Sequence, residues 1–270
     1  GPRVWLSVVA RARAVVIEPF LAGAVAGATA WVATRFGRRR ARARRQAALN
    51  RFLAYFDADA RAALEVARVE WGKRGVATFL PVHVLWGLLQ IERFAVAIEA
   101  LGGSPAAIEN AVLEELDHPT LAPEEVSRVL NHAAGAALAL KREATIVGLW
   151  IGLARTNAAT LVDVPPLSSH ALSFWLVHGC REPAVTTADG EATVVLRNDD
   201  YTTMEFVVAL LRDVFALPEP RAQEIMRYVH ERGRADVGRY PGAEAVAKVG
   251  QARALARREG HPLRIAIESM

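Results

Sequence analysis

The stretch VVLRNDDYTTMEFVVALL, residues 194–211, changes its apolar period halfway along and decides the fold of the C-terminal region. Its β-branched start is typical of a strand, NDDYT of a turn, and the remainder has helical spacing. Further on, the pattern predicts a helix closed by Gly233, a short strand, a helix ending at Gly260 and a last strand, LRIAIES. This order of elements indicates a small α+β domain.

The same region resembles the ClpS family of bacterial adaptors over the whole of 192–270, on three separated motifs that occur in order. VVLRNDDYTTMEFVVALL is similar to V-x-L-x-N-D-D-x-T-x-M-E-F-V, with Thr203 where Pro is common. MRYVHERGRADVG (226–238) is similar to M-x-x-V-H-x-x-G-x-A-x-x-G, and EGHPLRIAIE (259–268) to the closing H-P-L-x-x-x-x-E. The resemblance implies an adaptor that delivers N-degron clients to an ATP-dependent Clp protease, following the N-end rule.

A free N-terminus is an ammonium group that loses water on entering a pocket, so it needs several oxygen or nitrogen acceptors. The resemblance assigns this contact to Asn198, Asp199 and His230, with Asp200 in support. The client's first side chain then enters an apolar cavity, which favours Leu, Phe, Tyr or Trp. The positions that match the family's cavity are Thr202, Met204, Val207, Leu210, Met226 and Val229.

Taken alone, NDDYT is also typical of a simple turn before a helix, with Thr202 or Thr203 as the N-cap and Met204 or Val207 in the core. On the helix after Pro241, Lys248 matches a basic position of the family's unfoldase-docking face. Glu244 lies beside Ala243, which stands where the family often has an acidic residue. The implied partner is a ClpA-like or ClpC-like AAA+ unfoldase.

Residues 50–179 have helical periodicity throughout, which predicts an all-α domain. Residues 59–89 are echoed by 123–153, each a helical hairpin whose second helix carries a W-x-L or W-x-G-L ending, at Trp86 and Trp150. The pattern resembles the double helical repeat of the Clp N-terminal domain, with Pro81–Leu89 in place of T-x-E-H-L-L-x-x-L-L. His83 is expected to be a structural residue at a helix start.

A short polar linker is predicted at 180–191, between the helical domain and the ClpS-like domain. Since ClpS docks on the Clp N-terminal domain, two hypotheses follow. The first is delivery of clients to an external unfoldase. The alternative is a membrane-tethered scaffold or regulatory decoy, in which the two domains dock on each other in cis.

The first 49 residues contain an apolar stretch at 14–34 that is followed by the Arg-rich run 35–45. Its length is close to the ~20 residues that cross a bilayer, although Glu18 and Pro19 interrupt its start. The arginines would hold the following residues in the cytoplasm, anchored to the inner membrane. The alternative is a buried or surface helix with a basic end.

Enzymes are the contrasting class. The sequence has no G-x-S-x-G, HExxH, G-x-G-x-x-G or Walker A motif, and its seven His show no metal-ligand spacing. The single Cys180 forms no internal disulfide. We therefore expect no catalysis, cofactor or metal, and no nucleic-acid partner, since the Arg run is explained by a membrane flank.

Overall fold

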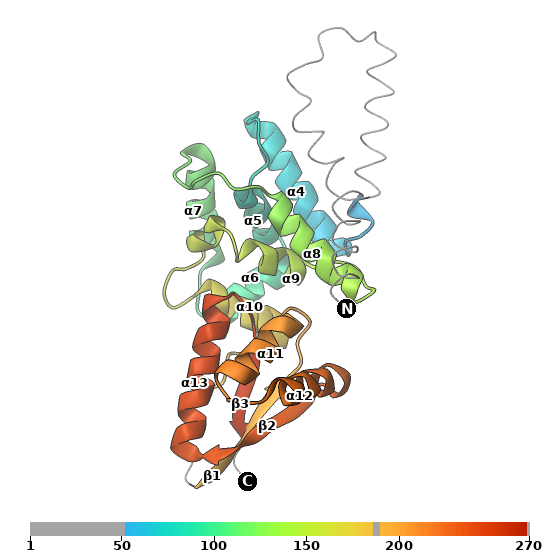
Figure 1. Ribbon diagram of the computed structural model, residues 1–270. Coiled ribbons are helices and arrows are strands. Elements are labelled where there is room, and N and C mark those ends of the chain that lie inside the picture. Colours follow the sequence, from blue (N-terminus) through green and yellow to red (C-terminus); the bar gives the residue numbers. More distant parts are fainter. Residues whose placement is uncertain (1–51, 186–189, 269–270) are drawn as a thin grey trace. The chain divides into compact units, whose positions relative to one another are not determined.

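The computed structural model describes residues 52–185 and 190–268, so the apolar stretch predicted at 14–34 lies outside the described residues (Figure 1). The chain divides into two compact units: unit 1 ends at Ser169, and unit 2 runs from His170 to Met270. Each unit is described by itself below.

Unit 1 is helical, as the periodicity predicts. Its helices are α4 (Ala58–Arg74), α5 (Pro81–Leu89), α6 (Glu92–Ala100), α7 (Pro105–Asp117), α8 (Ser127–Ala139), α9 (Ile146–Leu153) and the 3₁₀ helix η2 (Asn157–Leu161). Side-chain caps begin three of them, because Asp57, Ser104 and Thr145 each accept a hydrogen bond from a backbone N–H of the first turn.

Two helical hairpins, α4 with α5 and α8 with α9, account for the internal repeat. Glycines bring each pair close together: a Cβ on Gly87 would lie 2.0 Å from the carbonyl oxygen of Ala63, and one on Gly152 would lie 2.7 Å from that of Val129. Trp150 is fully buried, with its ring 5.4 Å from that of Phe94. The resemblance of this unit to the Clp N-terminal domain stays a prediction.

Unit 2 has the predicted α+β order. It contains α10 (Ser169–His178), β1 (Glu191–Arg197), α11 (Met204–Asp213), α12 (Glu219–Arg232), β2 (Arg234–Pro241), α13 (Gly242–Arg258) and β3 (Arg264–Glu268). The three strands form an antiparallel sheet in the order β2-β1-β3. The central strand β1 ends where Arg197 lies opposite both Arg234 and Arg264.

One face of this sheet is buried under the last three helices. Alternate β1 residues, Ala192, Val194 and Leu196, join the core together with residues of α11, α12 and α13. Gly233 ends α12 with a φ of 81°, a left-handed conformation that glycine adopts without strain. The chain then returns directly into β2, which places the end of α12 beside the end of β1.

Among the described residues, no single helix is long and apolar enough to span a membrane. One bent pair, Pro81–Leu89 with Glu92–Ala100, meets the length and composition requirement only when its two helices are taken together.

Candidate functional site

The loop between β1 and α11 holds the predicted acceptors for an ammonium group. The backbone N–H of Asn198 donates to the carbonyl oxygen of Gly233 at 2.8 Å, which fixes the start of this loop against the end of α12. His230 lies in the last turn of the same helix and is exposed. A hydrogen bond between backbones far apart in the sequence therefore brings Asn198 close to the helix turn that carries His230.

Asp199 organises the loop through its carboxylate. Oδ1 accepts from the backbone N–H groups of Tyr201 and Thr202, at 2.8 and 2.6 Å, and Oδ2 accepts the Thr202 hydroxyl at 2.7 Å. Burial raises the pKa of Asp199, although these hydrogen bonds and the nearby His178 favour its ionised form. Most of its accepting capacity is thus used inside the loop. Asp200 is exposed.

The predicted cavity residues lie on α11 and α12, with different burial. Val207, Leu210 and Val229 belong to the apolar core, and each is at most 8% exposed. Met226 packs partly against the core, while Met204, the first residue of α11, is 43% exposed. The flexible thioether side chains therefore lie at the outer edge of a packed apolar layer, where they can adapt to an entering group.

Thr203 is the N-cap of α11, since its hydroxyl accepts the N–H of Phe206 at 3.3 Å. The interpretation of NDDYT as a turn followed by a cap is therefore correct for this residue. A helix cap at Thr203 is compatible with a binding site in the preceding loop, because the turn that ends at the cap also sets the direction of that loop and of Met204.

The predicted docking residues lie on α13. The ammonium of Lys248 donates to the carbonyl oxygen of Val214 at 2.9 Å and lies over the rings of Phe215 and Tyr240. Glu244 is half-exposed, with its carboxylate 3.6 Å from Lys248. Lys248 is thus engaged within unit 2, which leaves Glu244 as the more accessible of the two.

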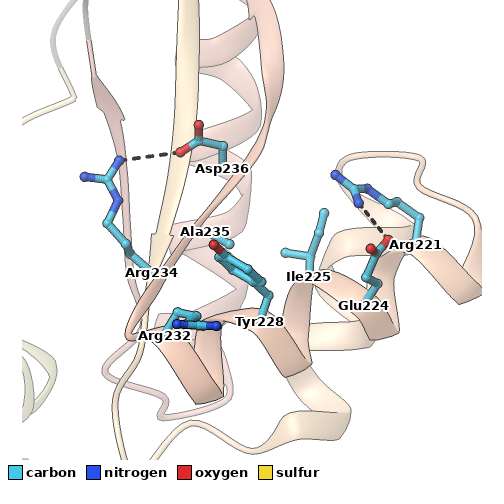
Figure 2. A pocket seen from close by; sticks show the side chains of 8 residues that line it. All are labelled: Arg221, Glu224, Ile225, Tyr228, Arg232, Arg234, Ala235 and Asp236. Atoms are coloured by element: carbon cyan, nitrogen blue, oxygen red, sulfur yellow. Dashed lines mark hydrogen bonds and ion pairs between the residues drawn. The ribbon is translucent and has the colours of Figure 1, made fainter.

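A separate groove of about 590 Å³ lies between α12 and β2 (Figure 2). Its lining includes Arg221, Tyr228 and Arg232 of α12, and Arg234 of β2. At 100° per residue these α12 positions lie on a different helix face from Met226, Val229 and His230. The groove is therefore distinct from the predicted cavity.

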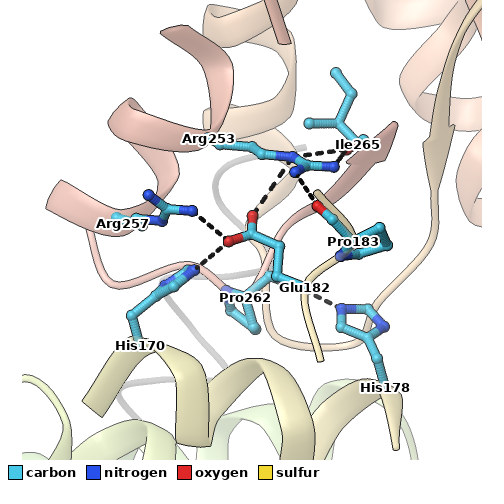
Figure 3. A network of polar contacts seen from close by, with 8 residues as sticks. All are labelled: His170, His178, Glu182, Pro183, Arg253, Arg257, Pro262 and Ile265. Carbon is cyan, nitrogen blue, oxygen red and sulfur yellow. Dashed lines mark hydrogen bonds and ion pairs between the residues drawn. The ribbon is translucent and has the colours of Figure 1, made fainter. Parts of the chain in front are cut away.

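The sequence analysis missed a polar network around Glu182, in the predicted linker 180–191, and His178, in the region predicted as the helical domain (Figure 3). Glu182 contacts Arg253 and Arg257 of α13, and His178 contacts the carbonyl oxygen of Pro262. One signal was available: Arg253 lies on the apolar stripe of its helix beside Ala252 and Ala256, where a charge requires a buried partner.

Unit 2 is thus a small α+β domain in which the loop after β1 and the end of α12 carry polar acceptors, beside an apolar layer formed by α11 and α12. The family model for "ATP-dependent Clp protease adaptor protein ClpS" matches residues 188–266. The chain is 49% identical over 77 residues to the ClpS adapter of Nitratidesulfovibrio vulgaris, which is 28% of this chain and 77% of that protein. The chain belongs to the ClpS family through this region.

A second relative gives a similar match. The ClpS adapter of Neisseria meningitidis is 44% identical over 77 residues, which is 28% of this chain and 75% of that protein. The structure of Agrobacterium tumefaciens ClpS2 bound to L-phenylalaninamide is 33% identical and covers 30% of this chain and 98% of that one, with a TM-score of 0.29.

Proposed function

We propose that unit 2 binds the free N-terminal residue of a client protein and delivers that client to a Clp AAA+ unfoldase. The observation that carries the proposal is the hydrogen bond from Asn198 to Gly233, which brings the loop after β1 to the end of α12. This bond holds the backbone of Asn198 against the end of α12, whose last turn carries His230.

An ammonium group suits this pair. The side-chain oxygen of Asn198 and the free nitrogen of a neutral His230 both accept hydrogen bonds. Asp199 adds negative charge from within the loop, and Asp200 adds more from its exposed position. Hydrogen bonds to a charged group contribute about 1.5–3 kcal/mol each, so an acetylated N-terminus, which has neither the charge nor the spare donors, is bound much more weakly.

The apolar layer selects the first side chain. Met204 and Met226 lie at its edge, with Val207 and Val229 behind them. Burying a Leu or Phe side chain there would contribute about 1.5–3 kcal/mol. Clients that begin with Leu, Phe, Tyr or Trp are therefore favoured over those that begin with small or charged residues. The family membership supports the same assignment, and α13, with Glu244 and Lys248, is the proposed docking face for the unfoldase.

The test is peptide binding to the full chain, measured by fluorescence anisotropy. We expect a Phe-initiated peptide with a free α-amino group to bind at least about 10-fold more tightly than its acetylated form. Asn198→Ala is expected to abolish most of this preference. The matched control is Arg258→Ala, an exposed residue of α13 that pairs only with the adjacent Glu259 in the described structure. Equal binding of both peptides to the wild-type chain would contradict the proposal.

A further inference from the structure

The segment from α10 to Val185 precedes the region matched by the ClpS family model, yet it packs within unit 2. Val185 contacts the apolar core of the sheet and its helices. Two polar anchors, at Glu182 and His178, hold the remainder of the segment (Figure 3). The segment is therefore a structural part of the unit that contains the candidate site.

The first anchor joins Glu182 to a buried arginine, Arg253. Arg253 is 5% exposed, and its Nε and Nη2 donate to the carbonyl oxygen of Ile265 at 3.0 and 2.7 Å. Its Nη1 donates to the carbonyl oxygen of Pro183. The carboxylate of Glu182 lies 3.5 Å from Arg253 and also pairs with Arg257. One guanidinium thus joins α13, β3 and the segment.

The second anchor reaches the chain before β3. Nε2 of His178 lies 2.7 Å from the carbonyl oxygen of Pro262, and because that oxygen only accepts, Nε2 carries the proton.

The contact between His178 and Pro262 is also connected to α11, through the neighbouring residue His261. His261, the neighbour of Pro262, is buried with its ring 4.3 Å from that of Phe206. Phe206 lies in the first turn of α11, and its N–H is held by Thr203. The end of α10 is thus connected, through Pro262 and His261, to the first turn of α11, which directly follows the loop 198–203.

We infer that α10 and residues 179–185 form a brace that positions the loop 198–203 for the client's α-amino group, with His178 as the positioning residue. This inference rests on the proposed function. A loop that is ordered before binding loses less conformational freedom when the client enters, so the brace increases affinity without touching the client. It acts on recognition of the amine more than on that of the side chain.

The test compares His178→Ala, His178→Gln and Glu182→Gln in the full chain, with Arg258→Ala as the control. For each protein the affinity of a Phe-initiated peptide is measured with a free and with an acetylated N-terminus. We expect His178→Ala to lower the preference for the free amine about 10-fold, the effect of one lost hydrogen bond. His178→Gln, whose amide can donate to Pro262, is expected to restore most of it.

A merely structural role would lower the melting temperature and leave the amine preference of the folded protein unchanged. A lowered melting temperature with an unchanged amine preference in His178→Ala would contradict the proposal that the brace positions the loop. Where His178→Ala does not fold, Glu182→Gln decides: a several-fold loss of amine preference supports the brace, and an unchanged preference overturns it. Absence of amine preference in the wild-type chain is a separate result, which counts against the proposed function itself.

Discussion

The carboxyl group of Glu182 has a strongly lowered pKa. Burial alone would raise the pKa of Glu182, but its contacts with His170 and Arg257 and the charge of Arg253 outweigh burial and lower the pKa to about 2. The Nε2 of His170 lies 3.7 Å from the Glu182 carboxylate. Glu182 is thus ionised at neutral pH.

A pH dependence of stability follows from this shift. The folded pKa lies below the ordinary value of 4.5, so the stabilisation is fully present above that pH and is lost as the pH falls towards 2. Its size is on the order of 3 kcal/mol. We expect the wild-type chain to be more stable than Glu182→Gln at pH 6, and the two proteins to converge near pH 2. The measurement is chemical unfolding of unit 2, followed by the amide signals of β1. A constant difference across this pH range would contradict the assignment.

Thr203 offers a second test at the residue scale. Its φ of −71° is close to the value that proline imposes. Thr203→Pro removes the hydroxyl cap on Phe206 but also restricts the unfolded chain. The two effects oppose each other, so we expect the unfolding free energy to change by less than about 1 kcal/mol, as measured by chemical denaturation. A larger loss would show that the cap is essential to the loop.

At the scale of single elements, the hairpins of unit 1 depend on glycine. A Cβ on Gly87 of α5 would meet the backbone of α4, which cannot yield as a flexible side chain does. Gly72 of α4 is the matched control, because a Cβ there meets nothing within 4 Å. We expect Gly87→Ala to destabilise unit 1 by about 1–3 kcal/mol and Gly72→Ala to stabilise it by about 0.5–1 kcal/mol, as measured by thermal unfolding. Similar effects of both substitutions would contradict the close approach of α4 and α5.

The elements that the sequence predicts correctly are those with strong local signals. The period change after Arg197 and the glycines at 233 and 260 predict the elements of unit 2. The acidic pair Glu124 and Glu125 after Pro123 is typical of a first helical turn, but α8 begins only at Ser127, and Glu124 instead accepts the N–H of Asn157. A local pattern cannot show a contact so far along the chain.

The segment 180–185 was missed for the same reason. It has no periodicity, so the sequence predicts a linker, but its order depends on Arg253, about 70 residues further along the chain. The candidate site was predictable residue by residue only through the family resemblance. The structure adds that Asp199 is largely occupied within its own loop, and that Val207, Leu210 and Val229 are part of the core.

At the scale of the whole molecule, the described residues 52–185 and 190–268 form two compact units, each with buried apolar residues of its own. The aromatic cluster around Trp150 and Phe94 lies in unit 1, and the layer between the sheet and α11–α13 lies in unit 2. Compact units with separate cores generally respond separately to a substitution in one of them, since effects are additive for distant sites. The proposed binding function belongs to unit 2 alone.

This organisation predicts that, in the full chain, the stability of unit 1 and the peptide affinity of unit 2 can be lowered independently of each other. Gly87→Ala acts on the core of unit 1, so we expect it to lower the unfolding temperature of that unit while the affinity for a Phe-initiated peptide stays within about 2-fold of wild type. His178→Ala is expected to lower the affinity for the peptide and to leave the unfolding temperature of unit 1 unchanged, because the contacts of His178 lie within unit 2. Calorimetry and peptide anisotropy on the same samples check both. A Gly87→Ala chain that remains folded in unit 2 yet loses peptide affinity would show that unit 1 contributes to recognition, and the site would then have to be extended beyond the loop after β1.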